Sequence, residues 1–290
     1  MSLPDQTMPA TQPLSRVVRT AFGSMIVPTY DTVVGRCLLL YGEWAFAEMA
    51  LLKSLLRDGD VVVDCGAHIG THSLFFARQV GRQGHVFSFE PQRLLFQHLC
   101  GTIALNGLTN VITFWAALGE TPGTLRPPEI DPSKPENLGG RAMDGDVTPG
   151  AMQVPVMTLD SMKLPACRLI KIDAEGMERA VIQGAAQTIR KYRPLLYVEN
   201  NKADLSAALI DAISALGYRL YWHFSPYFRP GNFNKRAENV FPNTADPNML
   251  CLPAEVEAAL PALDLVQGVQ DDWLKARQRL IDRIKAAKKI

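Results

Sequence analysis

The sequence of 290 residues lacks the cysteine pattern of a disulfide-stapled or zinc-binding protein. Its five cysteines stand at positions 37, 65, 100, 167 and 251, and no two of them form a Cys-x-x-Cys pair. Small disulfide frameworks and structural zinc sites are usually built from closely spaced cysteines. We therefore expect a hydrophobic core, without covalent cross-links, to hold the fold together.

The chain also lacks a large net charge of either sign and a long apolar run. Its formal charge is +1, which gives no broad basic field for nucleic acid. No stretch offers the ~20 uninterrupted apolar residues that cross a bilayer. With 47% hydrophobic residues, the chain can bury a core in one large domain. We expect a soluble, cytoplasmic protein that binds neither nucleic acid nor membrane and acts on a small or neutral acceptor.

What the sequence does contain is a buried strand that runs into a glycine turn at residues 61–70, VVVDCGAHIG. The three valines suit a parallel strand buried on both faces, and Asp64 follows them. Gly66 and Gly70 allow a sharp turn, and residues 71–80 continue with the apolar spacing of a helix. A helix N-terminus at the carboxyl end of a strand is a ligand site in open α/β sheets.

The spacing of this turn distinguishes between ligands. A dinucleotide pyrophosphate requires Gly-x-Gly-x-x-Gly, but the position two after Gly66 is His68, whose side chain obstructs a pyrophosphate. S-adenosylmethionine (SAM) carries no phosphate and is compatible with it. Glu90 ends the next apolar strand, residues 85–89, where its carboxylate can accept both ribose hydroxyls. The turn with Glu90 favours a nucleoside ligand over a plain βαβ unit whose carboxylates cap turns.

Five further short motifs follow the turn: FEP at 89–91, LNGL at 105–108, ALG at 117–119, KIDAEG at 171–176 and VE at 198–199. With residues 64–70, they resemble the FkbM family of SAM-dependent methyltransferases over about residues 41–199. A looser similarity continues through residues 221–223, 239–241 and 248–250. The chain departs from the family at His68, usually Asn, and at Cys65, usually a small aliphatic residue. Because His68 can still form hydrogen bonds, cofactor binding is retained.

The resemblance implies a fold and a cofactor. The fold is a doubly wound α/β sheet of the Rossmann-like, seven-stranded class I methyltransferase type, with an N-terminal β-hairpin extension and a C-terminal helix. Strand and helix patterns alternate along residues 61–116, which also argues for a parallel sheet. The cofactor is SAM, and the implied cofactor-binding residues are Asp64, Gly66, Ala67, His68, Gly70, Glu90, Pro91, Glu43, Ala117 and Asp173.

Three regions are expected along the chain. They are an N-terminal extension (1–40), a methyltransferase domain (41–253) that contains an active-site insertion rich in proline and glycine (121–150), and a helical tail (254–290). The hairpin is predicted to pair residues 25–27 with residues 32–34. The tail helix, from residue 271, is expected to serve packing or homo-oligomer formation, because a membrane-binding role suits its pattern less well.

The helices and strands are predicted from their apolar spacing. Strands are expected at 61–64, 85–89, 111–116, 169–172, 195–198, 218–223 and 248–252, and helices at 43–56, 71–80, 94–105, 178–192 and 205–216. Glu48, on the first of these helices, is expected to be solvated. His72 is assigned to a helix surface. Glu43 precedes the first helix, where the family resemblance brings it near the amino group of SAM.

Methyl transfer from SAM requires a nucleophile in line with the methyl group and, for a hydroxyl, removal of its proton. Candidate side chains at the carboxyl edge of the predicted sheet are Asp173, Glu175, Glu199, Asn200 and His223. We assign catalytic roles to Asp173, Glu199 and His223. His223 is placed at the end of the sixth strand, where its imidazole can act as a general base.

Asp173 and Glu199 end neighbouring predicted strands. With Asn200, they resemble in placement the ligands by which catechol O-methyltransferase holds Mg²⁺, and such oxygen ligands suit Mg²⁺, Mn²⁺ or Ca²⁺. A cation there would lower the pKa of the acceptor hydroxyl and orient two oxygens of a diol. The alternative is that Asp173 orients substrate or cofactor without metal and that Glu199 caps a strand end.

The sequence thus predicts a SAM-dependent O-methyltransferase that acts on a hydroxyl of a sugar or natural-product scaffold, as a small molecule or glycan. After the fourth strand it reads DAEG (173–176), and the lack of Asn/Asp-Pro-Pro-Tyr/Phe there argues against amino-group methylation. Methylation of RNA ribose or protein is the alternative that the near-neutral charge disfavours. A non-catalytic SAM-binding protein is disfavoured by Asp64, Glu90 and Asp173. A nicotinamide oxidoreductase is the remaining option.

Overall fold

The computed structural model describes residues 13–143, 152–257, 260 and 263–287. The first residues of the predicted extension (1–12), the end of the predicted insertion (144–150) and the end of the predicted tail (288–290) lie outside the described residues.

The protein is built around one sheet of eight strands in the order β13-β11-β12-β10-β9-β3-β4-β5. The five strands from β10 to β5 are parallel, and β12 is antiparallel to both of its neighbours. The strands are β3 (Val61–Cys65), β4 (His85–Phe89), β5 (Val111–Phe114), β9 (Leu169–Ile172), β10 (Leu195–Glu199), β11 (Tyr218–Pro226), β12 (Ala245–Pro253) and β13 (Asp264–Leu265). The seven predicted strands are therefore confirmed as a doubly wound α/β sheet, and β13 extends its edge.

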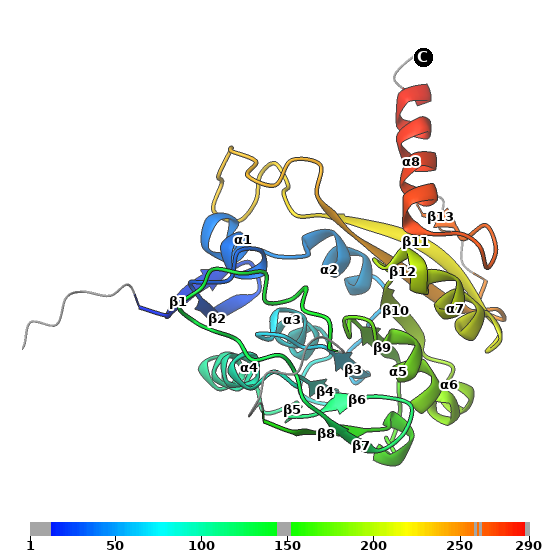
Figure 1. The fold of residues 1–290 in the computed structure, drawn as a ribbon, viewed down its shortest axis with the longest axis horizontal. Helices are drawn as coiled ribbons and strands as arrows, with labels where there is room; N and C mark the ends of the chain where they lie inside the picture. The colour runs from blue at the N-terminus through cyan, green and yellow to red at the C-terminus, as the bar shows by residue number, and fades with distance from the viewer. Residues whose placement is uncertain (1–12, 144–151, 258–259, 261–262, 288–290) are drawn as a thin grey trace, which may run out of the picture.

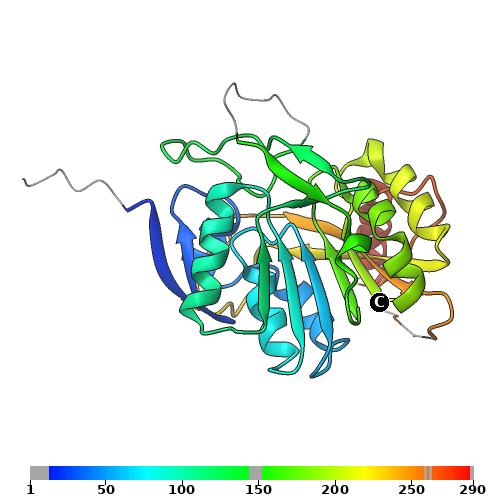
Figure 2. The ribbon, with the colours of Figure 1, turned by 90° about the horizontal axis from the view of Figure 1, so that it is seen from below.

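Helices cover both faces of the sheet (Figure 1, Figure 2). Val62 packs in the hydrophobic cluster of α1, α2 and α3, and Val63 packs in the cluster of α5, α6 and α7. Side chains of a strand alternate between its faces, so β3 is buried on both sides as predicted. The helices are α1 (Val34–Tyr41), α2 (Phe46–Lys53), α3 (Thr71–Gln79), α4 (Arg93–Leu105), α5 (Glu178–Gly184), α6 (Ala186–Tyr192), α7 (Ala203–Ser214) and α8 (Trp273–Ala287).

The N-terminal hairpin exists, but its strands differ from the prediction. β1 (Ser15–Thr20) pairs with β2 (Gly23–Pro28), and the hairpin lies along α4 (Figure 2). Residues 32–34, predicted as the second strand, lead into α1. The Asp31 side chain accepts hydrogen bonds from the backbone N–H groups of Val33 (3.0 Å) and Gly35 (2.8 Å). This local capping explains why a β-branched run begins a helix here.

β11 is longer than predicted. All nine of its residues pair with β12, from Tyr218 opposite Pro253 to Pro226 opposite Ala245. His223 therefore lies inside the strand, opposite Asn248, and not at its end as expected from the sequence.

Two predicted helices also differ in their limits. The helix predicted over residues 178–192 is divided at Ala185 into α5 and α6. A Cβ at Gly184 would lie 1.9 Å from the carbonyl oxygen of Gly119, so the chain passes there too closely for any side chain. The helix predicted over 43–56 is the shorter α2.

A small second sheet has the order β6-β8-β7. Its strands are β6 (Ala117–Leu118), β7 (Gly123–Leu125) and β8 (Val154–Met157), and the short 3-10 helix η1 (Leu159–Met162) follows it. The segment predicted as an insertion thus begins with strand β7 of this sheet.

The C-terminal helix α8 stands off the body of the protein (Figure 1). Its base is attached through Ala276, which is fully buried, and through Arg279, which pairs with Asp264 and Asp271. Leu274 and Ile284 are exposed. In the described parts of the chain, no helix has both the length and the apolar character that a bilayer crossing needs.

Candidate active site

A cavity opens at the carboxyl edge of the main sheet, beside the neighbouring strands β3 and β9. The strand order reverses there, because β4 and β5 follow β3 on one side and β10 follows β9 on the other. Open α/β sheets bind ligands at such a switch point. The predicted cofactor-binding residues that line the cavity are Gly66, Ala67, His68, Glu90, Pro91, Ala117 and Asp173. Residues of the predicted insertion line it too, namely Asn137, Gly139, Gly140 and Met143.

The glycine turn is held closely against the neighbouring strands. Gly66 has a φ of +77°, and a Cβ there would lie 1.7 Å from the carbonyl oxygen of Asp173. Only glycine fits this position. The N–H groups of Gly66 and Ala67 both donate to the carbonyl oxygen of Phe89, at 3.0 and 2.9 Å. Gly70, with a φ of +90°, directly precedes α3.

Glu90 is fixed by two backbone hydrogen bonds. Its Oε2 accepts from the N–H of His68 at 2.9 Å, and its Oε1 accepts from the N–H of Gln92 at 2.8 Å. Burial raises the pKa of Glu90 to about 7, although these hydrogen bonds oppose the shift. Each carboxylate oxygen keeps a further lone pair, so a cavity-lining Glu90 can accept the two ribose hydroxyls that the sequence assigned to it.

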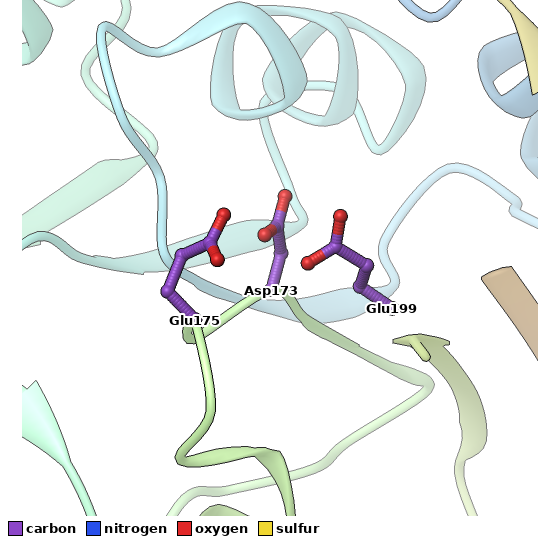
Figure 3. Close-up of side chains that lie close together, drawn as sticks. All are labelled: Asp173, Glu175 and Glu199. Carbon is purple, nitrogen blue, oxygen red and sulfur yellow. The ribbon is translucent and has the colours of Figure 1, made fainter. Parts of the chain in front are cut away.

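Three carboxyl groups converge on one side of the cavity. Asp173 lies between Glu175 and Glu199, and oxygens of all three lie within 4.8 Å of one another (Figure 3). Burial, followed by the charge of Asp173, raises the pKa of Glu199 well above its usual value and that of Glu175 to about 7. Glu199 Oε2 is buried and has no hydrogen-bond partner among the described residues. This oxygen-rich donor set fits a hard divalent cation.

The predicted third metal ligand is corrected by the structure. The amide of Asn200 donates to Ser206 Oγ at 2.9 Å, and Asn200 is absent from the described lining of the cavity. Glu175 takes its place beside Asp173. Lys202 forms an ion pair with Glu175 at 3.2 Å and so offsets part of the negative charge.

Lys171 connects the glycine turn to these carboxylates. Its buried Nζ donates to the carbonyl oxygen of Gly66 (3.0 Å) and to Asp173 Oδ2 (3.2 Å), and lies 3.6 Å from Asp64 Oδ1. Burial raises the pKa of Asp173, but the Lys171 ammonium outweighs it, and the pKa is lowered on balance. Asp64 also accepts a hydrogen bond from Ser73 Oγ at 2.6 Å. Asp64 was expected to contact the cofactor, but it is not found in the described lining of the cavity. It supports the glycine turn through Lys171 and Ser73.

Two other predicted site residues are engaged elsewhere. The Glu43 carboxylate accepts hydrogen bonds from Nε (2.9 Å) and Nη2 (2.7 Å) of Arg229 and from the backbone N–H of Phe233. It therefore anchors the loop that contains these two residues. His223 Nδ1 lies 2.8 Å from Tyr197 Oη, and burial lowers its pKa to about 4. Neither residue is found in the part of the cavity wall that the structure describes.

The family model described as "Methyltransferase FkbM domain" matches residues 64–220, more than half of the chain. The match includes the glycine turn, Glu90 and the three converging carboxylates. The chain belongs to the FkbM methyltransferase family. The matched region is accordingly a SAM-dependent methyltransferase domain, and Gly66 and Glu90, which line the cavity, belong to it.

Solved methyltransferase structures align with this FkbM chain at low identity. An FkbM methyltransferase from Methylobacillus flagellatus is 17% identical (TM-score 0.45); the alignment covers 77% of this chain but only 55% of that one. A putative rRNA methylase from Clostridium thermocellum is 12% identical (TM-score 0.43), with coverages of 74% and 98%. Aeropyrum pernix fibrillarin, solved with bound S-adenosyl-L-methionine, is 10% identical (TM-score 0.41), with coverages of 83% and 84%. No curated protein matches the chain.

The sequence did not reveal a buried pair at this cavity, of which His72 belongs to the described lining and Glu48 does not. His72 Nε2 lies 3.0 Å from Glu48 Oε2, and both side chains are buried, although a surface and a solvated position were predicted. The signal was present for Glu48, because the buried Leu52 stands four residues after it on α2 and so shares its side of the helix. For His72, its position in the first turn of the helix after the glycine turn could have indicated that it lies at the cavity and not on the protein surface.

The cavity also has an aromatic and acidic wall. Trp44 and Tyr227 pack with ring centroids 4.7 Å apart, and Tyr227 Oη donates to Asp246 Oδ1 at 2.6 Å. All three residues line the cavity. They come from segments about 200 residues apart, so only the folded sheet brings them together.

Proposed function

We propose that the protein transfers the methyl group of SAM to a hydroxyl of a sugar or natural-product scaffold. The observation that carries the proposal is that the glycine turn and Glu90 share one cavity with three carboxyl groups whose oxygens lie within 4.8 Å of one another. SAM, when bound, supplies a methyl group on a positively charged sulfur. The chain must then hold the acceptor in line and receive its proton.

The wall formed by Trp44, Tyr227 and Asp246 supports a hydroxyl-bearing ring as the acceptor. An aromatic face covers the apolar side of such a ring, and a carboxylate accepts its hydroxyls. The formal charge of +1 provides no broad basic surface for RNA. A small molecule or glycan is therefore the acceptor class that we propose.

We further propose that Asp173, Glu175 and Glu199 hold Mg²⁺, Mn²⁺ or Ca²⁺. A cation resolves the repulsion among the three carboxylates and satisfies the buried Glu199 Oε2. It would lower the pKa of the acceptor hydroxyl and orient a neighbouring oxygen. Without a cation, Glu199 keeps a proton and shares it with Asp173, since burial and the Asp173 charge raise the pKa of Glu199.

The acceptor class is tested by measuring formation of S-adenosylhomocysteine with glycosides, hydroxylated natural products, RNA and protein. We expect turnover with hydroxylated small molecules or glycans, and a methyl ether in the product by mass spectrometry. Turnover with RNA or protein alone would contradict the proposal and identify the acceptor as a macromolecule. Binding of SAM without turnover on any acceptor would point to a non-catalytic role.

The cation is tested by exhaustive chelation followed by addition of Mg²⁺, Mn²⁺ or Ca²⁺. Activity should be lost and then restored, and Glu199→Gln should reduce activity while SAM affinity is kept. Glu257→Gln, at an exposed position, is the matched control. Full turnover after chelation would exclude the cation and leave the shared proton as the better account.

A further inference from the structure

The pair of His72 and Glu48 joins two helices at the cavity wall. His72 is the second residue of α3, and Glu48 is the third residue of α2. His72 Nε2 lies 3.0 Å from Glu48 Oε2, with side-chain exposures of only 6% and 5%. Glu48 Oε1 accepts a second hydrogen bond from Asn248 Nδ2 at 3.1 Å. Both carboxylate oxygens are thus fixed, and the imidazole is held by one of them.

His72 lines the same cavity as the glycine turn and Asp173. Because Glu48 occupies Nε2, the other ring nitrogen, Nδ1, is left for a ligand, and it makes no hydrogen bond within the described part of the chain. When Nε2 carries the proton and donates it to Glu48, Nδ1 presents a lone pair. Carboxylate-oriented imidazoles of this kind serve as general bases in other enzymes.

We infer that His72 is the general base of the methyl transfer and that Glu48 is its positioning residue. The inference rests on the proposed function, since only a hydroxyl acceptor needs a base. The hydroxyl proton moves to His72 Nδ1 as the oxygen's electron pair forms a bond to the methyl carbon. The carbon–sulfur bond breaks and its electrons stay on sulfur, leaving neutral S-adenosylhomocysteine. The imidazolium then returns its proton to water.

Two other basic groups, His223 and Asp173, suit this role less well. His223 is engaged by Tyr197, and the described lining of the cavity does not include it. Asp173 forms an ion pair with Lys171, which lowers its basicity. Burial lowers the pKa of His72 to about 4, so the ring is neutral near pH 7. An ionised Glu48 would stabilise the imidazolium that forms.

Several neighbouring groups shift the pKa values of Glu48 and His72. Burial raises the pKa of Glu48 to about 8; Lys171 on β9 opposes this, and Asp173 adds to it. Asn248 on β12 favours the ionised form of Glu48 through its hydrogen bond, and the nearby Ser225 hydroxyl on β11 acts in the same direction. Burial and then the charge of Lys171 lower the pKa of His72, whereas Asp64 on β3 and Asp173 act to raise it. No hydrogen bond or ion pair joins the pair to Asp173, Glu175 or Glu199 among the described residues.

The test compares His72→Gln and Glu48→Gln with the wild-type enzyme and with His85→Gln, a control at an exposed histidine. His72→Gln should lower kcat by about 10²–10⁴-fold, the range for losing a general base. Calorimetry with S-adenosylhomocysteine should show an affinity within about twofold of wild type. At saturating SAM and cation, the wild-type kcat should rise with pH to about 8, where Glu48 ionises, and Glu48→Gln should remove this rise.

A second measurement does not depend on turnover. In ¹⁵N-histidine NMR of the free protein above pH 8, His72 should carry its proton on Nε2 and none on Nδ1. The inference would be overturned by full activity of His72→Gln or by a proton on Nδ1 of His72. It would also be overturned if His72→Gln lost enough affinity for S-adenosylhomocysteine to account for the whole loss of rate. A wild-type protein that methylates no hydroxyl would overturn the proposed function, and the role of His72 as base with it.

Discussion

At the scale of single residues, the proposed cofactor end of the cavity depends on Gly66 and Glu90, whose surroundings restrict which residue can stand there. Gly66 is required because the Asp173 carbonyl oxygen occupies the space of a side chain. Glu90 is the proposed acceptor of the ribose hydroxyls, and two backbone N–H groups hold it in place. Such preorganisation reduces the ordering that binding must pay for.

Glu90→Ala should weaken SAM binding by about 1.5–3 kcal/mol, the range for hydrogen bonds to a charged group. Because burial raises its pKa to about 7, protonation should also weaken SAM binding as the pH falls below that value. Isothermal titration at pH 6 and pH 8 measures both effects. Glu257→Ala serves as the control, and an unchanged affinity in folded Glu90→Ala would contradict the assignment to the ribose.

At the scale of elements, apolar period and glycine placement predicted the strands of the sheet and the turn after β3. These features are local, so a single sequence carries them. The hairpin strands and the end of β11 were missed because Asp31 capping and pairing with β12 decide them. The cavity wall was predicted at the glycine turn and Glu90, whereas the Glu48–His72 contact depends on the packing of α2 against α3.

Helix α8 was predicted to serve packing or a homodimer, and its exposed apolar residues make the dimer testable. If α8 pairs with a second copy, light scattering after size exclusion should give twice the chain mass of 32.0 kDa. The double variant Leu274→Lys, Ile284→Lys should then be monomeric, because charge at an apolar contact is costly. Gln278→Lys on the same helix is the control. A monomeric wild type would leave α8 as a packing helix.

At the scale of the whole molecule, buried carboxyl groups make stability depend on pH. The folded-state pKa of Glu90 is raised to about 7 and that of Glu48 to about 8, mainly by burial. A raised folded-state pKa means that the folded form binds the proton more tightly. The corresponding stability is present below the unfolded-state value and is lost as the pH rises through about 7 to 8.

The Tm of the chelated, ligand-free protein should therefore fall between pH 6 and pH 8.5. We expect a drop of several degrees, since about 1 kcal/mol shifts the Tm of a large domain by roughly 2–4 °C. Differential scanning calorimetry measures it. Glu90→Gln, which cannot ionise, should show a smaller drop than wild type, and Glu257→Gln should show the same drop. A Tm that rises with pH over this window would contradict the assigned shifts.

Lys171 contacts the carbonyl oxygen of Gly66 on one side and the carboxylate of Asp173 on the other. One buried side chain therefore joins the glycine turn of the proposed cofactor site to the proposed cation ligands. Ligands at sites joined in this way bind with a coupling free energy, and the coupling is reciprocal. If a divalent cation raises the affinity for SAM by some factor, SAM must raise the affinity for the cation by the same factor. The two would then bind to this protein cooperatively, as heterotropic ligands.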